Sequence, residues 1–183
     1  MTMTEESWTS RKTAATRLHL VHVPADVLCA LAREDLESAR AMMPMKLTPY
    51  LVSDECSGTW RRRSGQIARN PGDAAWVTRL AVEPHSRQVI GRAGYHGPPD
   101  EAGMVEIGYA IDPAHRRQGF ARAALVILLE TARSHPQVTV VRATVRPDNL
   151  PSRRLLDQYG FEEVGSQWDD EDGLETILEV GAS

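Results

Sequence analysis

Residues 104–145 read MVEIGYAIDPAHRRQGFARAALVILLETARSHPQVTVVRATV. The run 104–112 carries the aliphatic and aromatic side chains of a strand, and it ends at Pro113. Residues 119–135 then place alanines and leucines at helical spacing, with apolar side chains on more than one side of the helix. Residues 138–145 form a second strand, rich in β-branched side chains. This order of strand, helix and strand predicts a right-handed crossover between two parallel strands.

Shorter apolar runs on either side of the crossover predict the rest of the domain. The further strands are expected at 17–23, 76–82, 88–96, 161–168 and 174–180. A helix is expected to open at residues 24–26, and a short helix to span 149–159. The stretch 37–70 is expected to be helical in pieces, because it is interrupted by Pro44, Pro49, Gly58 and Gly65. The predicted fold class is α/β (α+β), with a mixed, mostly antiparallel seven-stranded sheet flanked by helices.

Length and composition set outer limits on function. The chain has 183 residues, which suits one domain over 16–181 after a flexible tail over 1–15. A net charge of −4 argues against general nucleic-acid binding, and the basic run Arg61–Arg62–Arg63 is interpreted as a solvated helix face. Two distant cysteines, Cys29 and Cys56, predict no metal site and reduced thiols in a cytoplasmic protein. No apolar run is long enough to cross a membrane.

A candidate anion site lies where the central helix begins. The first amides of a helix have no internal hydrogen-bond partner and carry partial positive charge, so they attract anions. Gly119 and Ala121 are small enough to let a diphosphate approach the backbone, and further contacts are expected from Arg116, Arg117, Gln118, Phe120 and Arg122. The alternative is an ordinary strand-to-helix turn with solvated arginines. Neither a Walker-type loop nor a Gly-x-Gly-x-x-Gly motif occurs in the sequence.

Three motifs in this order resemble the GNAT superfamily of N-acetyltransferases. They are the strand Val105–Ile111, the Arg-x-x-Gly-x-Ala cradle at Arg116, Gly119 and Ala121, and Asn149–Leu150–Pro151–Ser152 followed by Tyr159–Gly160–Phe161. The sequence Gly97–Pro98–Pro99 before the first motif is similar to the branch that acetylates ribosomal-protein N-termini. The resemblance covers about residues 16–181.

The resemblance implies where acetyl-CoA would bind. The fourth and fifth strands, 104–112 and 138–145, would splay apart to admit the pantetheine arm. The diphosphate would lie on residues 116–121, and an amide near Ala110–Ile111 would face the thioester oxygen. The arm and its sulfur would be contacted from both sides of the gap by Tyr109, Ala110, Ile111, Asn149 and Ser152.

The reaction needs a base for the amine and an acid for the thiol. A lysine amine has a pKa of about 10.4 and an α-amine about 7.7–8.0, so both are partly or wholly protonated near neutrality. Glu106 is the candidate base, and its alternative is a carboxylate that only orients the substrate. Ser152 is the candidate acid; water could replace it, and helix capping or cofactor binding is its alternative role. The position of the family's usual tyrosine, four residues before Gly160, holds Leu156, and Tyr159 is expected to pack.

These observations predict an acetyl-CoA-dependent N-acetyltransferase acting on a primary amine. A protein N-terminus and a small molecule such as an amino acid, a polyamine or an aminoglycoside all stay open as acceptors. No nucleic acid, membrane or metal ion is expected as a partner, and the chain is expected to be a monomer or homodimer. The main alternative is a non-catalytic acyl-CoA-binding sensor, and a third is an α/β domain with an incidental glycine turn. His96 is expected to be a solvated loop residue.

Overall fold

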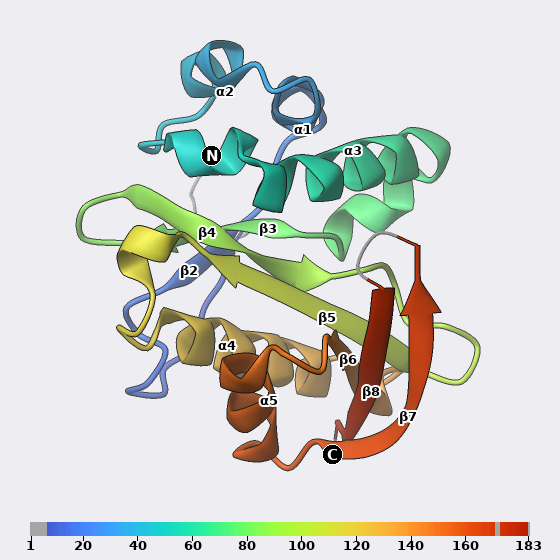
Figure 1. Cartoon of the computed structure of the whole chain (residues 1–183). Coiled ribbons are helices and arrows are strands. Elements are labelled where there is room, and N and C mark those ends of the chain that lie inside the picture. Colours follow the sequence, from blue (N-terminus) through green and yellow to red (C-terminus); the bar gives the residue numbers. More distant parts are fainter. Residues whose placement is uncertain (1–6, 171–172, 183) are drawn as a thin grey trace.

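A computed structural model describes residues 7–170 and 173–182 as one mixed sheet with helices on both faces (Figure 1). Its strands are β1 (Ser7–Trp8), β2 (His19–Val21), β3 (Arg79–Glu83), β4 (Gln88–Tyr95), β5 (Met104–Ile111), β6 (Val140–Val145), β7 (Glu162–Asp169) and β8 (Gly173–Gly181). They lie in the order β1-β2-β3-β4-β5-β6-β8-β7. Strands β5 and β6 run parallel and the other neighbours are antiparallel, which confirms the predicted class and the crossover.

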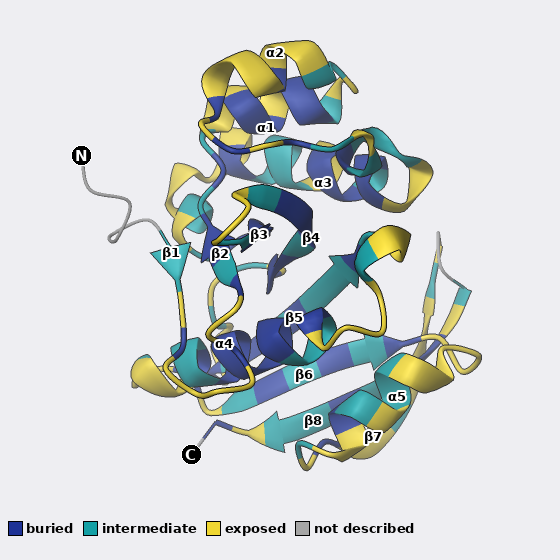
Figure 2. Cartoon of the chain, turned by 90° about the vertical axis from the view of Figure 1, so that its left-hand side faces the viewer, coloured by how far each residue is buried: buried dark blue, intermediate teal, exposed yellow. Residues whose placement is uncertain are grey.

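Two helical layers cover the sheet. The helices are α1 (Ala25–Ala32), α2 (Leu36–Met42), α3 (Asp54–Arg69), α4 (Phe120–Ser134) and α5 (Leu150–Asp157), with short 3-10 turns η1 (Pro49–Val52), η2 (Pro71–Ala75) and η3 (Pro113–His115). Helices α1 to α3 lie over one face, and α4 and α5 lie over the other (Figure 1). Helices α1, α2, α3 and α5 carry both buried and exposed residues, whereas α4 is buried along most of its length (Figure 2). Within the described ranges, no helix is long and apolar enough to cross a membrane.

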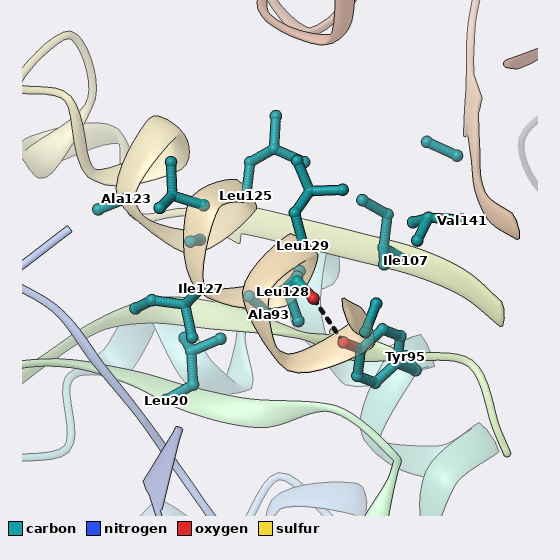
Figure 3. Close-up of a cluster of buried hydrophobic side chains, with 14 of the residues drawn as sticks. Leu20, Ala93, Tyr95, Ile107, Ala123, Leu125, Ile127, Leu128, Leu129 and Val141 are labelled. Carbon is teal, nitrogen blue, oxygen red and sulfur yellow. Dashed lines mark hydrogen bonds between the residues drawn. The ribbon is translucent and has the colours of Figure 1, made fainter. Parts of the chain in front are cut away.

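Helix α4 holds the larger core together. Seven consecutive residues, from Ala123 to Leu129, are buried, which confirms a helix packed on more than one side. Figure 3 shows its leucines against β-strand residues such as Ile107 and Val141. The buried Tyr95 hydroxyl donates a hydrogen bond to the Leu128 carbonyl at 2.6 Å (Figure 3). This burial fixes where α4 begins relative to the end of β5.

Strands β5 and β6 separate halfway along their length. Their parallel pairing runs from Met104↔Val140 to Ile107↔Ala143 and then stops. Residues 108–111 of β5 stay paired with β4 on the other side, while Thr144 and Val145 of β6 stay paired with β8. The expected splay of the two strands is therefore confirmed, and it opens toward the start of α4.

The prediction of a flexible tail over 1–15 is wrong for residues 7–15. This segment contributes the additional strand β1, so the sheet has eight strands rather than the seven expected. Strand β1 pairs with β2, and Ala15 is fully buried. The Trp8 ring packs edge-on against Tyr95, with ring centroids 5.2 Å apart. An apolar ring placed on the core holds this segment in the sheet. Residues 1–6 lie outside the described residues.

The expected breaks in the stretch 37–70 are only partly found. Gly58 and Gly65 both lie inside the continuous sixteen-residue helix α3. A glycine in a helix interior costs about 1 kcal/mol relative to alanine, which tertiary packing can offset. Here Trp60 is fully buried and its indole N–H donates to the Leu51 carbonyl at 2.7 Å. Packing of α3 on the sheet therefore overrides the local signal.

Candidate functional site

Backbone direction along β5 decides which groups face the gap. In an antiparallel pair, successive residues point their N–H and C=O groups alternately toward and away from the partner strand. The Glu106 carbonyl accepts from the His96 N–H at 2.8 Å, and the Asp112 N–H donates to the Ile90 carbonyl at 2.9 Å. Even-numbered residues of β5 thus face β4, and odd-numbered residues face β6 or, beyond the splay, the gap.

Tyr109 and Ile111 are oriented for the predicted backbone contacts, but Ala110 is not. The Ala110 carbonyl points at β4, where a Cβ on Gly91 would collide with it. The expectation that Ala110 contributes a backbone partner across the gap is therefore wrong. Of the gap-facing groups, the Ile111 carbonyl already accepts from the Arg116 Nε at 2.8 Å. Both backbone groups of Tyr109 and the N–H of Ile111 remain directed at the gap.

The start of α4 presents open amides, as the sequence predicts. Gly119, the N-cap, has φ 86° and Arg117 has φ 61°, so both lie in the left-handed region. The first helical bond runs from the Ala123 N–H to the Gly119 carbonyl, and no side chain caps the turn. The amides from Gly119 to Arg122 therefore have no helical partner. A Cβ on Gly119 would meet nothing within 4 Å, so the approach to these amides is open.

The arginines around this cradle differ in how they are engaged. The Arg116 Nη2 contacts both Glu55 oxygens, at 2.9 and 2.6 Å, and so ties the cradle to the start of α3. Arg122 donates to the Gln158 side chain at 2.5 Å. Arg117 has no hydrogen-bond or ion-pair partner among residues 7–170 and 173–182. Among these three arginines, Arg117 is therefore the one whose side chain is available to bind an anion.

Arg17 is a cradle residue that sequence reasoning missed. Its Nη1 donates to the Gln118 carbonyl at 3.1 Å, and its guanidinium carbon lies 4.2 Å from the centre of the Phe120 ring. Phe120 itself is buried in the core, so its side chain anchors the helix start rather than facing a ligand. Arg17 is 101 positions from Gln118, and no local motif announces the contact.

A hydroxyl pair lies on the α4 side of the gap. The Tyr109 hydroxyl and the Ser152 Oγ are 2.8 Å apart, which joins β5 to the first turn of α5. Burial raises the pKa of Tyr109, so its hydroxyl keeps its proton near neutrality. Asn149 caps α5 by accepting from the Ser152 N–H at 3.3 Å. Ser152 and Asn149, predicted to be near the pantetheine arm, thus lie at the helix end that meets Tyr109.

A polar cavity lies on the opposite face of β5, under α3. The Glu106 side chain points to this face, because its neighbours Val105 and Ile107 are buried in the α4 core. Its Oε1 accepts from the Thr144 Oγ1 at 3.0 Å and lies 3.4 Å from the His96 Nδ1. The cavity measures about 250 Å³, and its remaining walls come from Arg62, Arg63, Gln167, Asp169 and Glu175.

Electrostatics in this cavity favour a proton-accepting carboxylate. Burial raises the pKa of Glu106, and the Thr144 hydrogen bond opposes part of that rise. Burial, together with the positive charges of Arg63 and Arg62, lowers the pKa of His96 to about 3. His96 is therefore neutral near pH 7, and its contact with Glu106 is not an ion pair. A carboxyl whose pKa is raised toward neutrality suits general-base chemistry.

Sequence reasoning predicted few of the cavity's walls. The expectation that the basic run is a solvated face fits Arg61, whose Nη1 pairs with Glu34 at 3.1 Å. It is wrong for Arg63, which is half-buried and lines the cavity. His96 is an exposed loop residue, as expected, and its side chain also forms part of the cavity wall. Their positions depend on α3 lying over the sheet, which no local pattern reveals.

Comparison with known proteins places these features in a family. Residues 17–162 match the family described as "Acetyltransferase (GNAT) domain". A Bacillus subtilis relative, the uncharacterized N-acetyltransferase YjdG, is 34% identical over 95 residues, which are 52% of this chain and 56% of YjdG. The chain thus matches about half the length of that relative.

Solved structures share the fold at low sequence identity. RimJ of Mycobacterium smegmatis, in complex with CoA-disulfide, has a TM-score of 0.62 at 20% identity, covering 92% of this chain and 83% of RimJ. The ribosomal-protein-S5-alanine acetyltransferase of Vibrio fischeri has a TM-score of 0.64 at 13% identity, covering 91% and 94%. The predicted resemblance to ribosomal-protein acetyltransferases is confirmed at the level of the fold. With the splayed strands and the open helix start, the family match shows that this chain belongs to the GNAT acetyltransferase domain family.

Proposed function

We propose that the chain transfers an acetyl group from acetyl-CoA to a primary amine. One observation carries this proposal: the split in the sheet separates two polar clusters suited to opposite proton transfers. Glu106 lies on the α3 side, and the Tyr109–Ser152 hydroxyl pair lies on the α4 side. A thioester held in the gap between them would have a base on one side and a proton donor on the other.

The chain's own residues fit acetyl-CoA, which supplies the thioester when bound. The open amides from Gly119 to Arg122, with the Arg117 side chain beside them, suit a diphosphate. The gap-facing groups of Tyr109 and the N–H of Ile111 suit the amide groups of a pantetheine arm. Asn149 and Ser152, at the start of α5 beside Tyr109, would contact the arm and its sulfur.

Each polar group has a stated task in the proposed reaction. Glu106 takes a proton from the attacking amine, directly or through one water. The N–H of Tyr109 or Ile111 donates to the oxyanion that forms on the thioester carbonyl, a contribution worth on the order of 10²–10³ in rate elsewhere. Ser152 gives a proton to the departing sulfur while it takes one from the Tyr109 hydroxyl. Tyr109 then regains a proton from solvent and Glu106 releases the amine's proton to solvent, so the proton count closes. Because a thiol has a pKa of about 8.5, protonation of the sulfur needs only weak assistance.

The proposed acceptor is a primary amine, either of a protein N-terminus or of a small molecule. The first test is a thiol-release assay with acetyl-CoA over a panel of amines, in which the acetylated product is detected by mass spectrometry. The second measures whether CoA raises the melting temperature of the protein. We expect CoA protection and turnover on at least one amine. Protection without turnover would favour the acyl-CoA sensor, an alternative to which Leu156 in the usual tyrosine position lends support. Absence of both would contradict either function.

A further inference from the structure

The cavity beside Glu106 is lined by charged side chains of both signs. Among the described residues, Arg63 forms no ion pair with Glu106 or with Glu175, although all three side chains line the same cavity. A partly buried charge without a counter-charge is costly, and a ligand of opposite sign can offset that cost. The charges that line the cavity therefore indicate which charges a bound ligand would carry.

Arg63 is held in place by neutral groups. Its Nε donates to the Thr78 Oγ1 at 3.3 Å, and its Nη1 donates to the Gln66 Oε1 at 2.9 Å and to the His96 carbonyl at 3.0 Å. Gln66 is in turn oriented by a bond from its Nε2 to Asp73 at 2.8 Å. These contacts fix the guanidinium through neutral groups, and the Glu106 charge acts on it only from beyond ion-pair distance. Removal from water lowers the pKa of Arg63 to about 10, and the group stays charged at neutral pH.

The opposite wall is acidic. Glu175 is buried and accepts from the Gln167 Nε2 at 3.1 Å, and Asp169 lies at the rim from the same hairpin. Glu106 stands with them, held by Thr144. An ammonium group entering the cavity would be drawn to this wall, which is also where the proposed base stands.

We propose that the acceptor is a compact molecule carrying both a primary amine and a carboxylate, with its amine at Glu106 and its carboxylate at Arg63. This inference rests on the proposed acetyl transfer and names its substrate class. A volume of about 250 Å³ suits a free amino acid rather than a folded protein end. A polyamine would bring positive charge against Arg63. The Nε and Nη1 donors of Arg63 are held by Thr78, Gln66 and the His96 carbonyl, so the Nη2 group would donate the charge-assisted hydrogen bond to the carboxylate.

The first test needs no variant. At saturating acetyl-CoA, kcat/KM is measured for a series of α-, β- and γ-amino acids. Each amino acid is compared with its carboxamide and with the amine that remains after its carboxylate is removed. Spermidine and a short peptide with uncharged side chains are measured in the same way. We expect at least one amino acid to exceed its carboxamide and decarboxylated amine by about tenfold or more, the value of a hydrogen bond to a charged group. Equal rates within each set, or a clear preference for spermidine or the peptide, would overturn the inference while leaving acetyl transfer intact. No turnover with any amine would overturn both.

The second test removes the cation. Arg63→Met is compared with Arg61→Met, which alters a neighbouring arginine of α3 that pairs with Glu34 instead. We expect Arg63→Met to abolish the preference for amino acid over carboxamide and to leave the KM for acetyl-CoA unchanged, and Arg61→Met to preserve the preference. A purely structural role would lower the rates with acid and carboxamide alike. That outcome, or a retained preference in a folded Arg63→Met protein, would contradict the proposal.

Discussion

The cradle and the cavity are built in opposite ways. The cradle is made of backbone amides from one continuous segment around Gly119, and most of its side chains are engaged elsewhere, as Arg116 is with Glu55. The cavity is made of side chains from α3, from the residue after β4, and from β5, β6, β7 and β8. Backbone groups recognise a constant partner, whereas side chains can be exchanged without altering the fold. We infer that the cradle serves a co-substrate common to the family and the cavity serves the acceptor.

The largest effect should come from the cavity, through Glu106→Gln. Because Gln can still accept from Thr144, the cavity should keep its shape. We expect kcat to fall by about 10²–10⁴, the usual contribution of a positioned base. The pKa of Glu106 is raised, so in the wild type the base is lost as pH falls through that raised value. The variant should be furthest below the wild type between the raised pKa of Glu106 and the pKa of the amine, and should approach it both at lower pH, where Glu106 is protonated, and at high pH, where the amine is neutral.

The KM for acetyl-CoA is the internal control for that substitution. If cavity and cradle act separately, it should change less than about twofold. A pH–rate profile of the same shape in wild type and variant would remove Glu106 from the role of base and leave it as an orienting group.

The same contrast explains what could be predicted from the sequence. The crossover and the helix start lie within residues 104–145, where strand and helix periods, Pro113 and Gly119 mark the boundaries, and the family resemblance implied the splay. Thus most of the cradle could be predicted. The error at Ala110 arose because the side of a strand that a backbone group faces depends on its partner's register, here Arg92↔Ala110.

A smaller effect should come from the hydroxyl pair at the gap. Tyr109→Phe removes the partner of Ser152 and should lower kcat about ten- to a hundredfold, because proton return to Ser152 slows. Tyr159→Phe is the matched control, since Tyr159 packs beside the core and its ring lies 5.7 Å from the Arg122 guanidinium carbon. The measurement is the single-turnover rate of acetyl transfer in each variant, compared with that of the wild type. A loss beyond about a hundredfold in Tyr159→Phe, with little change in Tyr109→Phe, would reverse the assignment.

The smallest effect should come from the cradle, through Gly119→Ala. A non-glycine residue at φ 86° costs about 1 kcal/mol, so the turn should relax and withdraw its amides. We expect the KM for acetyl-CoA to rise about fivefold and the KM for the acceptor to stay the same. Gly72→Ala is the control, because a Cβ there would also meet nothing within 4 Å and no positive φ is required. Equal effects of the two substitutions would argue against a cradle at Gly119.

The cavity could not be predicted in the same way. Arg63, Glu106 and Glu175 are far apart in sequence and meet only because α3 lies over the sheet and the β7–β8 hairpin closes one side. Glu106 could be chosen because its neighbours alternate with it on a strand. Arg63 sits within three consecutive arginines, and a helical run of like charges gives no sign of which member turns inward.

The most direct measurement is residue-resolved amide hydrogen exchange across β5, with and without acetyl-CoA. In the free protein we expect the amides of Tyr109 and Ile111 to exchange quickly, because they face the gap, and that of Ala110 to exchange slowly, because it is paired with β4. Acetyl-CoA should slow Tyr109 and Ile111 and leave Ala110 unchanged. Slow exchange at Tyr109 and Ile111 before acetyl-CoA is added, or no change on adding it, would contradict a gap that receives the co-substrate.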